Sequence, residues 1–188
     1  MILPITVYGN PILRKVAEPV DFEKREINLS ELVDNMFETM YQANGVGLAA
    51  PQVNLSLALF VVDTAPFFEE DKSGEKPLKK AFFNPEVLEF MGENTPFNEG
   101  CLSVPTINED VVRKEGVRLY YQDVEGNEFE EEFHGKAARV IQHEYDHLLG
   151  KTFVDRLSPL KRTLLKSKLN EIAVGKRVPS YRVRPNKK

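Results

Sequence analysis

The sequence predicts an α+β fold for a single domain. Strand-like segments follow one another in the middle of the chain, and helical periodicity is confined to the segments before and after them. A regular alternation of strands and helices, which would indicate a parallel sheet, is missing. The 188 residues are 41% hydrophobic and 29% charged, so a chain of this length can bury a sizeable core.

Two helices are predicted near the N-terminus. Asn10 and Pro11 have the residue types of an N-cap and a first helical position, which indicates a short helix through Val16. Apolar residues then recur at helical spacing at Leu29, Leu32, Val33, Met36, Phe37 and Met40. They predict a helix that begins near Ser30, ends near Ala43 and packs Phe37 inward.

The middle of the chain predicts several strands. Residues 55–63 are apolar and β-branched, and residues 81–91 resume strand character after a charged surface loop at 69–80. Residues 111–132 predict two strands around a turn at 125–127. Two helices complete the expected order: residues 137–149, closed by Gly150, and residues 159–174, which begin at a proline and are closed by Gly175.

The first of these two later helices carries the sequence His-Glu-Tyr-Asp-His. His143 and His147 are four residues apart, which places both imidazoles on one helix face, where they can bind one divalent metal ion. Glu144 can then reach a water molecule on that metal. The alternative is a pair of buried histidines satisfied by hydrogen bonds, with Glu144 and Asp146 solvated.

Two histidines do not complete such a centre, because a catalytic site of this type takes three protein ligands and leaves a position for water. Cys101 is one candidate for the third ligand, since it is the only thiol of the chain. Glu171 is the other, and it would make the protein a zinc endopeptidase. A free cysteine is otherwise a small buried hydrophobe, and Glu171 is otherwise a solvated helix residue.

The charge distribution and the cysteine count suggest a cellular setting. The net charge is −4, but residues 158–188 hold ten Lys or Arg and one acid, a net +9. We therefore expect a single domain over residues 1–175 and a basic tail over residues 176–188 that could meet an anionic partner such as RNA. A lone cysteine, with neither a signal peptide nor a membrane-spanning apolar run, predicts a cytoplasmic protein with no membrane partner.

Three stretches together resemble the three motifs of the peptide deformylase family. They are Gly-Val-Gly-Leu-Ala-Ala-Pro-Gln at 45–52, Glu-Gly-Cys-Leu-Ser at 99–103 and Gln-His-Glu-Tyr-Asp-His at 142–147, in the family's order. The last helix resembles that of bacterial members. The family's fold is α+β, with small antiparallel or mixed sheets around the central metal-binding helix, N-terminal helices and a C-terminal helix.

The resemblance implies removal of the N-formyl group from the formylmethionine that starts new polypeptides. It assigns the metal ligands to Cys101, His143 and His147, and the general acid/base to Glu144. Gln52 and the backbone N–H of Leu102 would face the carbonyl oxygen. The expected ion is Fe²⁺, with Zn²⁺, Ni²⁺ or Co²⁺ able to occupy the same ligands. Glu99 and Arg113 would pair and brace the Cys101 segment.

The substrate is then expected to be an N-formylmethionyl nascent peptide. The glycines Gly45, Gly47 and Gly100 would leave backbone edges open to an extended peptide. An apolar pocket for methionine would be lined by Val46, Phe97, Val140 and His143. We expect the basic tail to be a candidate for docking on the ribosome, and DNA is not expected as a partner. The alternatives are a zinc protease and a metal-stabilised binding module without catalytic activity.

Overall fold

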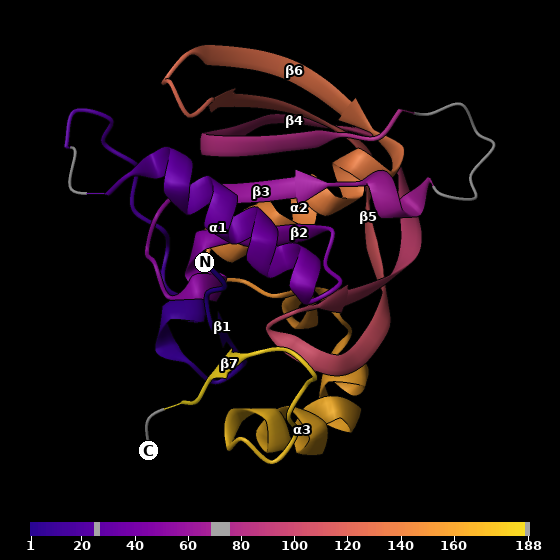
Figure 1. Ribbon diagram of the computed structural model, residues 1–188. Coiled ribbons are helices and arrows are strands. Elements are labelled where there is room, and N and C mark those ends of the chain that lie inside the picture. The colour runs from indigo at the N-terminus through magenta and orange to yellow at the C-terminus, as the bar shows by residue number, and fades with distance from the viewer. Residues whose placement is uncertain (25–26, 69–75, 187–188) are drawn as a thin grey trace.

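The computed structural model describes residues 1–24, 27–68 and 76–186 and confirms the α+β fold (Figure 1). One antiparallel sheet has five strands in the order β2-β3-β4-β5-β6. Their bounds are Gly47–Ala49, Leu59–Asp63, Lys79–Cys101, Val104–Gln122 and Glu128–His134. A second, parallel sheet pairs β1 (Ile5–Thr6) with β7 (Val183–Arg184), so the two ends of the described chain lie together.

In the described part of the chain, three α-helices surround and support the sheets. α1 (Leu29–Gln42) lies on one side of β3, and α2 (Gly135–Leu148) packs against β2, β3, β5 and β6 in the interior. α3 (Pro159–Ala173) lies at the opposite end of the molecule from β6 (Figure 1). The described residues also form four 3₁₀ helices that connect these elements: η1 (Pro11–Arg14), η2 (Ala50–Val53), η3 (Ala65–Phe67) and η4 (Phe153–Arg156).

β3 is apolar from Leu59 to Val62 because both of its faces are buried. Phe60 and Val62 pack in the cluster that contains α2, and Leu59 and Val61 pack in the cluster that contains α1. Side chains alternate between the two faces of a strand, so each face meets one helix. The strand begins at Leu59 and not at Leu55 as the sequence predicted. This arrangement fixes α2 beneath the sheet.

β4 and β5 are longer than the sequence predicted, with 23 and 19 residues. Breaking residues such as Asn84 and Gly92 adopt positive φ values of +47° and +74° where the pairing of β4 with β5 shifts register. Such bulges absorb an extra residue and bend a strand without ending it. As a result the hairpin continues past residue 91, and its far end lies below β2 and β3 (Figure 1). There Cys101 contacts His147 of α2.

The N-terminal helices are present, with two corrections. α1 begins at Leu29, next to the predicted Ser30, and its N-cap is Asn28, whose side chain accepts from the Glu31 amide at 3.2 Å. Phe37 is only half-buried and stacks on Tyr41, while Met36 takes the fully buried position. η1 ends at Arg14 and not at Val16. α2 and α3 end where predicted, next to Gly150 and Gly175, which have φ values of +69° and +72°.

The segment after α3 returns to the body of the protein. Ile5 pairs with Val183, and the Asn186 side chain donates to the carbonyls of Tyr8 and Ala173 at 3.0 and 2.9 Å. The division of the chain at Gly175 stays a prediction. Residues 187–188, and residues 69–75 of the expected surface loop, lie outside the described part, while Lys79 and Lys80 of that loop begin β4.

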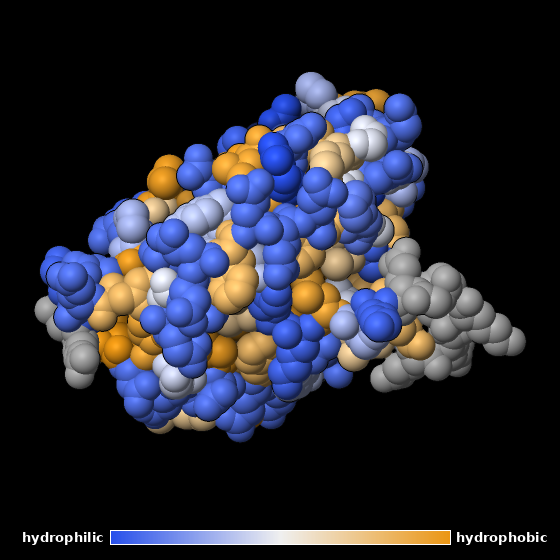
Figure 2. Space-filling model, turned by 90° about the horizontal axis from the view of Figure 1, so that it is seen from above, coloured by the Kyte–Doolittle hydropathy of each residue, from blue (hydrophilic) through white to orange (hydrophobic). Residues whose placement is uncertain are grey.

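The face over β4 to β6 is mainly hydrophilic, with small apolar patches between the charged side chains (Figure 2). Along β6 the exposed residues Glu128, Glu130 and Glu132 flank the half-buried Glu131 and the buried Phe133. Among the described residues, none of the helices has both the length and the apolar content that crossing a bilayer requires.

Candidate metal centre

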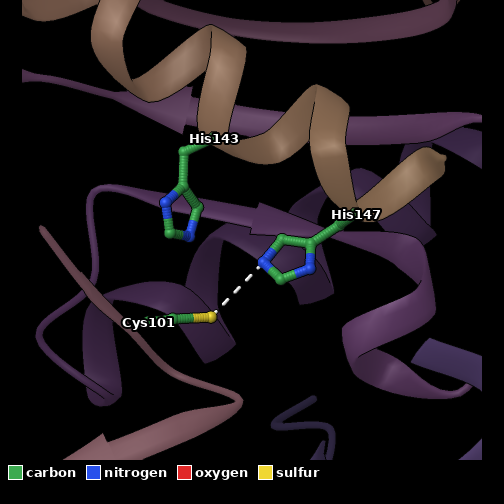
Figure 3. Close-up of side chains that lie close together, drawn as sticks. All are labelled: Cys101, His143 and His147. Carbon is green, nitrogen blue, oxygen red and sulfur yellow. Dashed lines mark hydrogen bonds between the residues drawn. The ribbon is translucent and has the colours of Figure 1, made fainter. Parts of the chain in front are cut away.

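Both histidines of the motif project from one face of α2 toward the end of β4 (Figure 3). His143 and His147 are buried, and their ring centroids lie 5.2 Å apart. Some buried polar residues of the helix make their hydrogen bonds, as Gln142 does to the carbonyls of Lys114 and Ala138 at 2.9 and 3.1 Å, whereas His147 Nδ1 and Glu144 Oε2 have no partner.

Cys101 completes a group of three candidate ligands. It is the last residue of β4, and its Sγ lies 3.3 Å from His147 Nε2 (Figure 3). One ligand atom from each of Cys101, His143 and His147 lies within 4.8 Å of the others. Glu171 is outside this group and instead pairs with Arg177 at 2.8 Å. It therefore does not supply the third ligand that the zinc endopeptidase alternative requires.

The electrostatics of the three residues favour a cation. Removal from solvent raises the pKa of the Cys101 thiol. The nearby His147 and His143 lower it by a larger amount, to about 5, so the sulfur is a thiolate at neutral pH. Burial lowers the pKa of His143, whereas Cys101 and Glu99 raise it to about 10. A cation held by these three residues would take the place of the His143 proton beside the thiolate.

A buried ion network orients the ligands from behind. Glu99 Oε2 accepts from His143 Nδ1 at 2.9 Å, which leaves Nε2 facing Cys101. Arg113 donates to both carboxylate oxygens of Glu99 at 2.7 and 2.9 Å, and to Asp146 Oδ2 at 2.7 Å. Burial raises the pKa of Glu99, but His143 and Arg113 lower it to about 2, so it stays ionised. The expected pairing of Glu99 and Arg113 is present.

Glu144 points to the same group with an unsatisfied oxygen. The residue is 4% exposed, and its Oε2 is a buried polar atom with no hydrogen-bond partner. Burial raises the pKa of the carboxyl to about 7. Gly47 in β2 makes room for this side chain, because a Cβ at that position would collide with the Glu144 carboxylate. Such a carboxyl can exchange a proton near neutral pH.

Gln52 and the turn after Cys101 form another side of the group. The Ala49 amide donates to Gln52 Oε1 at 2.7 Å, which turns Nε2 toward Cys101 Sγ at 3.6 Å and Ser103 Oγ at 3.2 Å. Leu102 lies in the turn between β4 and β5, with its side chain against Gly45. The amide of Gln52 is thus a fixed donor beside the thiolate.

A cavity of about 410 Å³ opens over this group. It is lined by every residue that the sequence suggested for the substrate: Gly45, Val46, Gly47, Phe97, Gly100, Val140 and His143. Gln52, Cys101, Leu102 and Glu144 line it as well, while His147 lies behind. A pocket of this size with an apolar wall and a few convergent polar groups is typical of a small-molecule or peptide-end site.

Sequence reasoning missed several residues of this region. Asp146 is 2% exposed and is paired with both Arg113 and Arg156, although the alternative interpretation of the motif placed it in solvent. Arg139 lines the cavity and donates to Glu99 at 3.3 Å. Tyr181, from the segment after α3, also lines the cavity. The sequence offered a signal for Asp146 alone, because that residue lies inside the motif. Arg139 and Tyr181 reach the site only when distant segments of the chain pack together.

The donor set fits one divalent metal ion. A thiolate and two imidazoles are ligands that Zn²⁺ and neighbouring transition metals accept, with ligand distances of about 2.0–2.3 Å. The 3.3 Å between Cys101 Sγ and His147 Nε2 suits two ligands of one ion. The unpartnered Oε2 of Glu144 would face a water molecule beside it.

Comparisons with known proteins agree on one family. The sequence model of the family described as polypeptide deformylase matches residues 2–163. A peptide deformylase of Christiangramia forsetii is 47% identical over all of this chain and 98% of its own length, and one of Cytophaga hutchinsonii is 49% identical over 98% and 97%. The crystal structure of a Legionella pneumophila peptide deformylase superposes with a TM-score of 0.79 at 41% identity, covering 95% of this chain and all of the other.

The ligand group predicts a contrast between two substitutions. Cys101→Ala should abolish retention of a metal ion during dialysis, because two imidazoles alone do not fill the site. Glu171→Gln should keep about one ion per chain, as the unchanged protein does. Metal analysis by mass spectrometry measures both. Loss of metal from the Glu171 variant and not from the Cys101 variant would contradict the assignment.

The buried network predicts a large loss of stability for Arg113→Met. This change leaves Glu99 and Asp146 short of a buried partner, and the expected cost is about 3 kcal/mol in the free energy of unfolding. Arg118→Met is the matched control, because Arg118 pairs with Glu89 and Glu130 at the surface and should cost less than about 1 kcal/mol. Urea unfolding at a fixed metal concentration measures the difference, and equal costs would refute it.

Proposed function

This chain belongs to the polypeptide deformylase family, and from that premise we propose which of its residues carry out the reaction. The protein is a metal-dependent hydrolase that removes the N-formyl group from the N-terminal formylmethionine of newly made polypeptides and releases formate. The observation that supports our residue assignment is the convergence of Cys101, His143 and His147, from two distant segments, on one small volume.

We propose that these three residues bind the metal ion. When bound, a divalent ion at such a site lowers the pKa of a coordinated water molecule and polarises the carbonyl of the substrate. The native ion is proposed to be Fe²⁺, and Zn²⁺, Ni²⁺ or Co²⁺ would suit the same donors, because the thiolate accepts each of them. Metal analysis of protein purified without oxygen tests this, and zinc as the dominant ion would contradict it.

Glu144 is proposed as the general acid and base. Its pKa of about 7 lets it accept a proton from the attacking water and later deliver that proton to the nitrogen of the departing amine. The water oxygen forms a bond to the formyl carbon and the C–N bond breaks, so the products are formate and a free α-amino group. The missing partner of Glu144 Oε2 supports this role, because a structural carboxylate at this depth would be paired.

Gln52 Nε2 and the backbone N–H of Leu102 are proposed to stabilise the charge that develops on the formyl oxygen. Gln52 is held by its bond from the Ala49 amide, so its donor needs little reorganisation during the reaction. A single donor of this kind typically contributes roughly 3 kcal/mol to lowering the barrier. Both donors lie close to Cys101, as this role requires. Leu102 follows it in the sequence, and Gln52 Nε2 lies 3.6 Å from its Sγ.

The substrate is proposed to bind as an extended peptide along the cavity. Backbone near Gly45, Gly47 and Gly100 would pair with the peptide, which gives affinity without regard to most side chains. The methionine side chain would enter the part lined by Phe97 and Val140. An apolar pocket that accepts an unbranched side chain suits methionine, because burial of that side chain contributes roughly 1.5–3 kcal/mol.

We also propose that the enzyme works in the cytoplasm and meets its substrates on the ribosome. Arg162, Lys166 and Lys168 are exposed on α3, while Leu165 and Leu169 of the same helix are buried. The three basic side chains lie on more than one side of α3, and a helix with such a basic exposed surface attracts an RNA-rich surface. A reducing compartment would also protect the thiolate ligand from oxidation.

The role of Glu144 predicts that Glu144→Ala keeps its metal and loses turnover. A missing general acid/base usually lowers kcat by about 10²–10⁴-fold. Formate release from a formyl-Met dipeptide measures kcat, and metal analysis is done on the same sample. Glu128→Ala, which removes an exposed carboxylate on β6, is the control and should retain activity. A fully active, metal-replete Glu144→Ala protein would refute the assignment.

The exposed basic residues of α3 predict weaker ribosome association after charge reversal. Replacing Arg162, Lys166 and Lys168 together by Glu should reduce co-sedimentation with ribosomes, while kcat on a dipeptide stays unchanged because the three side chains lie outside the cavity. Replacing Lys15, Lys24 and Lys151, which are exposed outside α3 and outside the cavity, by Glu is the control for the same change of net charge. Undiminished co-sedimentation of the α3 variant, or recovery of the protein outside the cytoplasm in cell fractionation, would contradict the proposal.

A further inference from the structure

The turn between β4 and β5 is held by hydrogen bonds from three separate parts of the chain. The Tyr8 amide donates to the Ser103 carbonyl at 2.7 Å, and Gln52 Nε2 donates to Ser103 Oγ at 3.2 Å. The hydroxyl of Tyr181 donates to the Leu102 carbonyl at 2.7 Å. This last bond comes from the segment after α3, which the family match over residues 2–163 does not include.

Tyr181 is fixed because its segment is anchored on both sides. Before it, Arg177 pairs with Glu171 at 2.8 Å and donates to Thr106 Oγ1 at 3.1 Å. After it, the Ile5 amide donates to the Arg182 carbonyl at 2.9 Å, where β7 joins β1. The chain therefore passes the β4–β5 turn between α3 and β7 in one defined position (Figure 1).

The contact reaches the cavity directly. Tyr181 and Leu102 both line it, and the Leu102 side chain lies so close to Gly45 that a Cβ there would come within 2.8 Å of Leu102 Cδ1. Leu102 is thus confined between Gly45 and Tyr181. Its N–H and C=O belong to the two peptide planes that meet at its Cα, so the bond to the carbonyl and the confined side chain together restrict the direction of the N–H.

We propose that Tyr181 is a positioning residue for deformylation: its hydroxyl holds the Leu102–Ser103 peptide so that the Leu102 N–H stays aimed at the formyl oxygen. This inference rests on the proposed role of Leu102. Burial and the charge of Cys101 raise the pKa of Tyr181, so the hydroxyl keeps its proton and remains a donor. The segment after α3 thereby takes part in catalysis without contributing a group to the reacting atoms.

The test is the substitution Tyr181→Phe, which keeps the ring in the cavity wall and removes only the donor. One neutral hydrogen bond that orients an oxyanion donor should lower kcat by about fivefold and leave KM for a formyl-Met tripeptide within about twofold. Metal content and the urea midpoint should match those of the unchanged protein. Tyr120→Phe, which removes a hydroxyl from β5 outside the cavity, should leave kcat and KM unchanged.

The outcomes separate this inference from the proposed function. An unchanged kcat in Tyr181→Phe would overturn the positioning role, as would a rise in KM alone or a loss of metal or stability that accounts for the lower kcat. If Gln52→Ala lowers kcat while Tyr181→Phe does not, only the inference about Tyr181 fails. If the unchanged protein releases no formate, the proposed function fails with it.

Discussion

The guanidinium of Arg113 joins the two elements that carry the candidate metal ligands. It lies on β5 and contacts Glu99, two residues before Cys101 on β4, and Asp146, one residue before His147 on α2. A buried charge of this kind costs several kcal/mol to desolvate, and only good geometry on all sides returns that free energy. Here Arg113 is 2% exposed and makes bonds to both carboxylates, so the network fixes the strand and the helix relative to each other.

This constraint explains why a loosely spaced set of residues can form a reactive site. In a flexible arrangement the thiolate and the Glu144 carboxylate would repel each other, and protons from the two imidazoles could neutralise them. In the fold they are held in place by groups behind them: Glu99 holds His143, and Gly47 leaves the space for Glu144. The perturbed pKa values of Cys101 and Glu144, about 5 and 7, follow from this enforced proximity and burial.

The ends of the chain serve the same site from the other side. β1 and β7 pair because the segment after α3 folds back, and that return brings Tyr181 to the turn that follows Cys101, which the Tyr8 amide contacts from the N-terminal segment. The turn is therefore supported from the N-terminal segment, from η2 through Gln52 and from the C-terminal segment. A short turn with its carbonyls satisfied in this way keeps its backbone donors in one direction.

The sequence by itself determined the α+β class, the helix that carries His143 and His147, and a short choice of third ligands. These depend on local periodicity and on residue chemistry, which one stretch of chain carries. The sequence did not determine the course of β4 and β5, because Asn84 and Gly92 interrupt a strand pattern yet form bulges within the strand. Nor could it place Asp146, Arg139 and Tyr181 at the site. Their contacts join segments far apart in the chain, and only the packing of α2, the long hairpin and the returning C-terminal segment brings those partners together.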